Sequence, residues 1–171
     1  MGKAKARLWS PYFENIATLR RQQIGFANST KATEWFIDLF ELKSMGQINV
    51  LEYLQRRRTA QKENLGIAIG YIKNQTKKFE PYRTQLISDC RNNLMGIEGS
   101  IAAMYWKAVA AAMPEPYSFE KRSRRPAADL FNAVLNYLYG MTYTIVESGI
   151  FAAGLDPYLG FIHVDEYRKP T

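Results

Sequence analysis

The chain has 171 residues, of which 47% are hydrophobic and 13% aromatic, enough apolar material to bury the core of one ordinary domain. Lysine and arginine outnumber aspartate and glutamate by 23 to 16, and the net charge of +7 favours anionic partners such as nucleic acid or an acidic membrane surface. The single cysteine, Cys90, excludes an internal disulfide, a paired-cysteine zinc site and a redox pair.

Residues 1–15 are short, aromatic and proline-containing, and their basic residues are not followed by the apolar core of a signal peptide. We expect them to be the last strand, or the linker, of something that lies upstream. The most apolar stretches farther on are interrupted by Lys107 and Glu147 and are too short to span a membrane. The sequence therefore predicts a cytoplasmic protein with no membrane association.

From residue 16 onward, apolar residues recur with the 3.6-residue period of an amphipathic helix. The first four predicted helices lie at 16–28, 29–43, 46–58 and 59–79. Ser29 or Thr30 is the expected N-cap of the second helix, and the arginine cluster at 56–58 suits the C-terminus of the third.

The second half of the chain continues the helical pattern. The predicted helices there lie at 80–90, 92–113 and 129–154, and a basic loop occupies 117–129. Pro81 is expected to open the first of these helices and Pro114 to follow the end of the second, which is apolar or small on most sides and therefore buried. Asp129 is the expected N-cap and Gly154 the expected C-cap of the third.

Strand patterns are almost absent, and no internal repeat or low-complexity segment interrupts the chain. The sequence therefore predicts an all-α domain over residues 16–171, built from roughly seven to nine helices. Since the Walker and dinucleotide glycine patterns are missing, and one histidine without a nucleophile elbow cannot make a Ser-His-Asp set, those hydrolase chemistries are excluded.

Glu98 is the only acidic residue on the predicted buried helix at 92–113, and it lies between Gly96 and Gly99. A buried carboxylate must be neutral, paired or bound to a cation, because an isolated buried charge is too costly. Two interpretations remain open. Glu98 either forms a structural ion pair with an arginine or binds a metal ion.

His163, the single histidine, follows the turn in "GLDPYLGFIH". A lone histidine is usually a hydrogen-bonded or surface residue, but glutamate and histidine together can also hold manganese or magnesium. The loop "KRSRRPAAD" offers Arg122, Arg124 and Arg125, whose guanidinium groups suit phosphate binding, although short basic loops are also common solvated surfaces.

Three segments in order, "GIEGSIAAMYW", the run from "FEKRSRRPAAD" to "NAVLNYLYG", and "GLDPYLGFIH", resemble the CRISPR-associated spacer-acquisition integrase family. The resemblance covers about Asn92 to Arg168. It implies the helical C-terminal domain of that family, with residues 1–15 as a remnant of the N-terminal β domain or a linker. It also implies a homodimer that joins a small companion CRISPR-associated protein and inserts DNA fragments into a repeat array.

The resemblance implies that Glu98 and His163 are catalytic residues and ligands of Mg²⁺ or Mn²⁺. The family's third, acidic ligand falls in a segment past the end of this sequence, so we expect a truncated fragment that lacks this ligand and the end of its catalytic-type domain. Arg122, Arg124 and Arg125 are expected to bind DNA. Tyr139 and Tyr143 are expected to line the site, with core packing as the alternative at their helical spacing.

The sequence thus favours a metal-dependent DNA integrase or endonuclease in which the cation stabilises charge during transesterification. Two alternatives remain: a non-catalytic helical module that binds DNA or a partner, and a structural domain whose Glu98 is paired.

Overall fold

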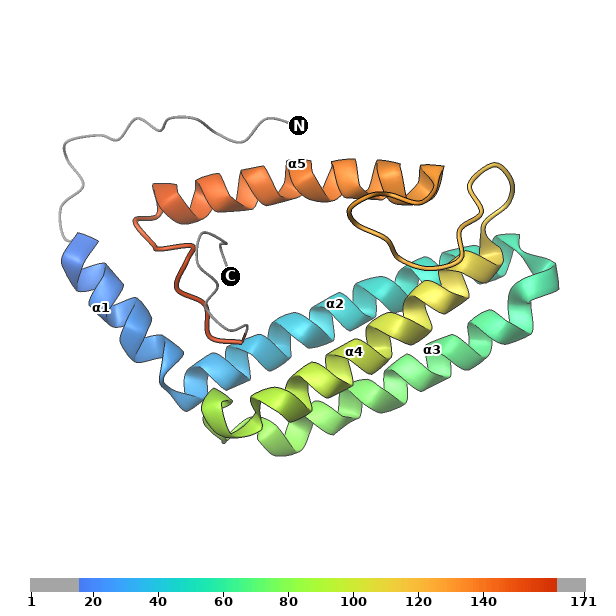
Figure 1. Ribbon diagram of the computed structural model, residues 1–171. Coiled ribbons are helices and arrows are strands. Elements are labelled where there is room, and N and C mark those ends of the chain that lie inside the picture. Colours follow the sequence, from blue (N-terminus) through green and yellow to red (C-terminus); the bar gives the residue numbers. More distant parts are fainter. Residues whose placement is uncertain (1–15, 163–171) are drawn as a thin grey trace.

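The computed structural model describes residues 16–162, and the expectations for residues 1–15 and for His163 lie outside this range. The described part contains five α-helices and two short 3-10 helices, with no strand between residues 16 and 162 (Figure 1), which confirms the all-α prediction. They are α1 (Ile16–Ala27), α2 (Thr30–Arg57), η1 (Thr59–Gln61), α3 (Lys62–Thr76), η2 (Lys77–Tyr82), α4 (Ile87–Ala112) and α5 (Leu130–Ala152). Along this part of the chain no helix is both long and apolar enough to cross a bilayer.

Helix α2 merges two predicted helices into one of 28 residues. The core stripe of Phe40, Ser44 and Leu51 continues through the predicted break, and each of these side chains is buried. Gly46 lies on the exposed side of the helix. Because packing of a continuous apolar face outweighs the roughly 1 kcal/mol cost of one glycine, the helix does not end there.

Helix α4 likewise joins the predicted helices at 80–90 and 92–113. Pro81 does not open a helix of its own but lies inside η2, and α4 begins at Ile87 after the extended residue Leu86. Met113 is extended and Pro114 follows it, as expected. Most residues of the predicted helix at 92–113 are buried or half-buried, as expected, but an exposed stripe of small and polar residues runs along α4. This stripe consists of Asn92, Gly96, Gly99, Ala103 and Lys107.

Helices α2, α3 and α4 run side by side as a three-helix bundle (Figure 1). Its core contains the fully buried side chains of Leu51, Leu65, Leu94 and Ile101. Arg83, after η2, fixes this turn against α2 because its guanidinium donates to Asp38 and, at 2.9 Å, to Glu41. The hydrogen bond to Asp38 is the main reason that the pKa of Arg83 is raised.

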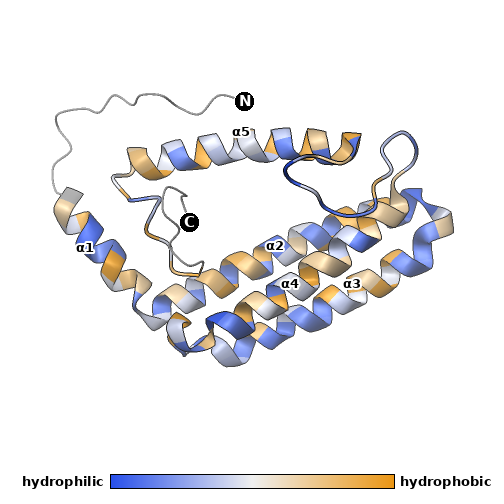
Figure 2. Ribbon diagram, viewed as in Figure 1, coloured by the Kyte–Doolittle hydropathy of each residue, from blue (hydrophilic) through white to orange (hydrophobic). Residues whose placement is uncertain are grey.

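Helix α5 crosses one side of the bundle as a separate layer (Figure 1). The predicted N-cap is confirmed, since the Asp129 carboxylate accepts from Asn132 N–H at 2.7 Å. Gly154, the expected C-cap, comes directly after the C-cap residue Ala153 and adopts φ 77°. The amides of Gly154 and Leu155 bond back to Phe151 and Ile150, each at 2.9–3.0 Å, which is the Schellman pattern of a helix end. Only Asn132 of α5 is buried, although apolar residues cover much of the helix (Figure 2).

Candidate metal and nucleic-acid site

Glu98 lies in the middle of α4 and reaches toward α2. Its Oε1 accepts a hydrogen bond from Lys43 Nζ at 2.8 Å, and its side chain is 23% exposed. The expected pairing of this carboxylate with a basic residue is therefore present, with a lysine rather than an arginine as the partner. Because the side chain is partly exposed, it is also accessible to a ligand from solvent.

Lys43 is the nearest cation that the structure places at Glu98. Its ammonium lies 4.6 Å from the ring centroid of Phe40, in a cation–π contact, and its side chain is 47% exposed. Gln47 lies one turn farther along α2, on the same side as Lys43. The Oε1 atom of Gln47 is buried and has no hydrogen-bond partner among residues 16–162.

The segment after α5 folds back onto the start of the bundle (Figure 1). Gln23 of α1 holds it through two hydrogen bonds with the backbone of Asp156, at 2.8 and 2.9 Å. The Phe161 ring packs 5.7 Å from the Trp35 ring, and the Phe161 carbonyl accepts from Arg91 Nη2 at 3.4 Å. The chain is therefore anchored on α4 immediately before the position of His163.

His163 itself lies outside the described residues, so its pairing with Glu98 stays a prediction. Within the described part, no group of three or more histidine, cysteine, aspartate or glutamate side chains is arranged to hold a metal ion. Glu98 is thus the one predicted metal ligand that the structure positions.

Asn132 organises the arginine-rich loop. Its side-chain oxygen accepts from Arg122 Nη1 at 3.0 Å and from the Ser123 amide at 2.9 Å. Its side-chain nitrogen donates to the Lys121 carbonyl and to the Asp129 carboxylate. All the polar atoms of this buried carboxamide side chain are therefore used to fold the loop against the start of α5.

The three loop arginines differ in their surroundings. Arg122 is half-buried, its guanidinium lies 5.9 Å from the Trp106 ring and 5.5 Å from the Tyr139 ring, and burial lowers its pKa. Arg124 and Arg125 are exposed, and the backbone carbonyl of Arg124 is held by Asn136 Nδ2 at 2.8 Å. The loop therefore presents two guanidinium groups to solvent from a backbone that is fixed.

Tyr139 and Tyr143 lie one turn apart on α5, with exposed fractions of 56% and 49%. Packing in the core, the alternative for these tyrosines, does not occur in this structure. Tyr139 contacts the guanidinium of Arg122, whereas Glu98 pairs with Lys43 of α2.

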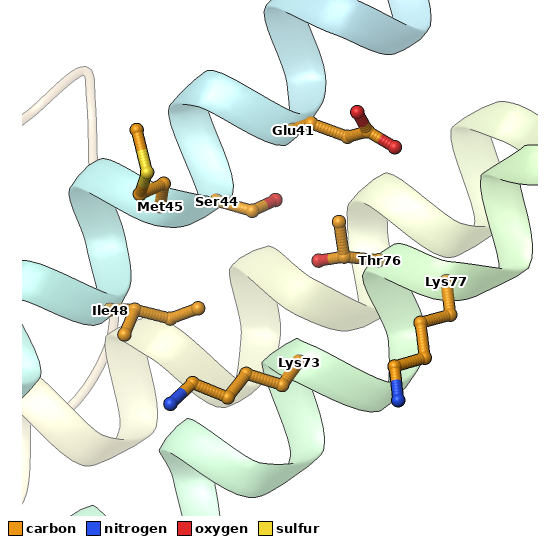
Figure 3. A pocket seen from close by; sticks show the side chains of 7 residues that line it. All are labelled: Glu41, Ser44, Met45, Ile48, Lys73, Thr76 and Lys77. Atoms are coloured by element: carbon orange, nitrogen blue, oxygen red, sulfur yellow. The ribbon is translucent and has the colours of Figure 1, made fainter.

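A cavity of about 350 Å³ opens between α2 and α3 (Figure 3). Its lining residues are Glu41, Ser44, Met45, Ile48, Lys73, Thr76 and Lys77. None of the predicted site residues lines it. The cavity is therefore separate from Glu98 and from the arginine-rich loop.

Sequence reasoning missed Lys43, Gln47 and Asn132. Lys43 is 55 positions from Glu98, so local periodicity carries no sign of their pairing. Asn132, in contrast, follows the predicted N-cap Asp129 by three positions, and this spacing is one that allows side chains to interact on a helix.

The fold and the site define an all-α domain with an accessible carboxylate and a separate basic loop. The model of the family described as CRISPR associated protein Cas1 matches residues 1–171, and the chain therefore belongs to the Cas1 family. CRISPR-associated endonuclease Cas1 1 of Archaeoglobus fulgidus is 28% identical over 174 residues, which cover 96% of this chain and 50% of that protein. CRISPR-associated protein Cas1 3 of Methanobrevibacter ruminantium is 30% identical over 173 residues, 99% of this chain and 51% of that protein.

The chain thus spans about half the length of the curated relatives that it matches over most of its residues. A CRISPR-associated exonuclease Cas4/endonuclease Cas1 fusion of Leptospira interrogans is 42% identical over 79 residues, 44% of this chain and 15% of that protein. In that relative, a Cas1 endonuclease is joined to a Cas4 exonuclease in one polypeptide.

Proposed function

We propose that this chain is part of a metal-dependent DNA endonuclease and integrase of CRISPR spacer acquisition. Its membership of the Cas1 family, several of whose members are named endonucleases, supports the nuclease activity. The observation that carries the proposal is the carboxylate of Glu98, which lies partly exposed on the bundle, where a ligand from solvent can reach it.

The surroundings of Glu98 fit a divalent cation. The carboxylate is a hard oxygen donor of the kind that Mg²⁺ and Mn²⁺ prefer. A Cβ added at Gly96 or Gly99 would meet no atom within 4 Å, so the neighbouring surface of α4 is open. When bound, the cation would stabilise charge on the attacking and leaving oxygens of a phosphodiester.

His163 is proposed as the second ligand on the basis of chain reach. Arg91 and Glu98 are two turns apart on one side of α4, which corresponds to about 10 Å along the axis. The Phe161 carbonyl accepts a hydrogen bond from Arg91 Nη2 at 3.4 Å, and His163 follows Phe161 by two positions. The described chain thus ends on the same helix as Glu98, one residue before His163, which supports His163 as the second ligand.

Arg124 and Arg125 are proposed to bind DNA phosphates, and Arg122 to hold the loop in position for them. The net charge of +7 supports a polyanionic substrate. Tyr139 and Tyr143 are proposed to line the path of the DNA. The homodimer, the small companion protein and the cytoplasmic location belong to the same proposal, and they follow from the family resemblance.

A second candidate function is a helical module that binds DNA or a partner without catalysis. The Lys43–Glu98 ion pair favours this candidate, because it neutralises the carboxylate without a metal ion. The two functions make different predictions for the same substitution.

Nicking of supercoiled DNA in the presence of Mn²⁺ distinguishes the metal-dependent nuclease from the non-catalytic binding module. Glu98→Gln keeps the shape of the side chain and removes its charge, so nicking should fall by at least about tenfold. Glu34→Gln, at an exposed position of α2, is the matched control and should nick like the unchanged protein. Equal nicking by the Glu98→Gln variant would disprove the proposed site, and unchanged DNA binding without any nicking would favour the binding module.

A further inference from the structure

We propose that Lys43 is a placeholder cation: it neutralises Glu98 until a divalent cation binds there, and it then neutralises a phosphate of the DNA. The inference rests on the proposed metal site, and it assigns a role to a residue that the sequence patterns do not single out.

The first step of the argument is the geometry of the pair. Lys43 Nζ lies 2.8 Å from Glu98 Oε1, so the ammonium occupies the first contact position on that carboxylate oxygen. A divalent cation bound to the same oxygen would repel the ammonium strongly, because two positive charges would lie within a few ångströms of each other. Metal binding at Oε1 of Glu98 therefore requires Lys43 to move away from this oxygen.

The second step is that Lys43 can leave at little cost. Its side chain is 47% exposed, and an ion pair this open to solvent contributes little to stability because water screens it. The flexible stem of lysine also gives the ammonium other positions to occupy. The ring of Phe40, 4.6 Å from Nζ, keeps the displaced ammonium near the site instead of letting it swing freely into solvent.

The third step is the fate of the displaced charge. Once Glu98 binds a divalent cation, Lys43 has lost the one ion-pair partner that it has among residues 16–162, while the local positive charge has increased. A phosphodiester brought to the cation supplies the missing negative charge. Lys43 is then a phosphate ligand beside the metal, and its contribution to DNA binding depends on the metal being present.

Removal of the lysine charge should therefore have opposite effects on two ligands. In Lys43→Met, Mn²⁺ should bind about five to ten times more tightly, measured as free Mn²⁺ by electron paramagnetic resonance, because the competing charge is gone. The same variant should bind DNA more weakly when Mn²⁺ is saturating, and the slope of log affinity against log salt should fall by about 1. Without Mn²⁺ the slope should not change, because Lys43 is then occupied by Glu98.

Two variants make the test specific. Lys73→Met removes the same charge from α3, where Lys73 lies 3.8 Å from Glu52, and should leave Mn²⁺ affinity within about twofold of the unchanged protein. Lys43→Arg keeps the charge and should restore the Mn²⁺-dependent salt slope. Thermal unfolding of each variant identifies any loss of folding.

Every outcome decides the inference. Mn²⁺ binding that Glu98→Gln weakens but Lys43→Met leaves unchanged would overturn the role of Lys43 while the proposed metal site stands. Mn²⁺ binding that is the same in Glu98→Gln and the unchanged protein would overturn both. Tighter Mn²⁺ binding together with a Mn²⁺-dependent loss of DNA affinity supports the inference.

Discussion

A buried polar side chain without a hydrogen-bond partner lowers the stability of the folded state. Ser44 of α2 is 1% exposed, and its hydroxyl has no hydrogen-bond partner among residues 16–162. Figure 3 places this side chain between α2 and α3, at the cavity but buried in its wall. A hydroxyl desolvated without a partner destabilises the folded state, since it loses its bonds to water and gains none.

Ser44→Ala should therefore raise the free energy of unfolding, by about 0.5–2 kcal/mol, because it removes the unpaired hydroxyl and introduces a better helix former. Urea unfolding measures the change. Ser148→Ala is the matched control, since the Ser148 hydroxyl lies exposed on α5 and donates to the Thr144 carbonyl at 2.7 Å. A gain of the same size in both variants would mean that helix propensity alone explains the effect, and a loss in Ser44→Ala would contradict the prediction.

The residues that could be predicted from sequence are those whose role is set locally. The Asp129 cap and the Gly154 turn depend only on their neighbours in the chain, and both are confirmed. An ion pair between Glu98 and a basic residue is one of the two interpretations of the sequence. Its partner could not be identified, because Lys43 comes from another helix. The role of His163 stays a prediction that rests on the family resemblance and on the anchoring of Phe161.

At the scale of elements, the type of each helix could be predicted but its length could not. The sequence predicts separate helices on either side of residues 44–45 and of residue 91. Tertiary packing instead continues α2 past Gly46 and α4 past Cys90, whose side chain is fully buried in the core. Local helix propensity contributes less free energy than a continuous buried face. The same physical cause therefore makes α2 and α4 each continue through a predicted break.

The loop between α4 and α5 combines a hydrogen-bonded backbone with exposed charges. Asn132 and Asn136 hold its carbonyls and amides, and Arg122 is tied to the aromatic rings beneath it. The stacked rings of Phe119 and Phe131, with centroids 4.1 Å apart, join the loop to the first turn of α5. Phosphate contacts presented from a fixed backbone lose less conformational entropy on binding than contacts from a flexible one.

Arg124→Ala together with Arg125→Ala should weaken DNA binding at every sequence tested and lower the salt slope by about 1–2, since up to two phosphate contacts are lost. Fluorescence anisotropy over a range of salt concentrations measures both quantities. The matched control is Arg20→Ala with Arg21→Ala, which removes the same charge from the exposed side of α1. Equal losses in the two double variants would indicate a general charge effect and would contradict a specific role for the loop.

At the scale of the whole molecule, the described part divides into a packed bundle and a weakly packed α5. The bundle has a continuous core, whereas α5 exposes large apolar side chains on several sides of the helix. They are Leu130, Val134, Tyr137, Leu138, Tyr139, Met141, Tyr143, Ile145 and Val146. A helix that is apolar on most sides is characteristic of the interior of a larger assembly, and an exposed patch of this kind promotes association.

The chain should therefore bind the dye ANS and self-associate at micromolar concentration, and a charge placed in the patch should reduce both. Ile145, 70% exposed on α5, is the most accessible of these side chains, and Ile145→Lys should lower ANS fluorescence and the apparent mass in light scattering. Ile67→Lys is the matched control, because Ile67 of α3 is 60% exposed on the outer side of the bundle and belongs to no such patch. Both substitutions should change the free energy of unfolding by no more than about 0.5 kcal/mol relative to the unchanged protein, as expected for exposed sites. A large loss of stability in Ile145→Lys alone would mean that α5 is packed in solution, and the description of α5 as an unpacked apolar helix would then be wrong.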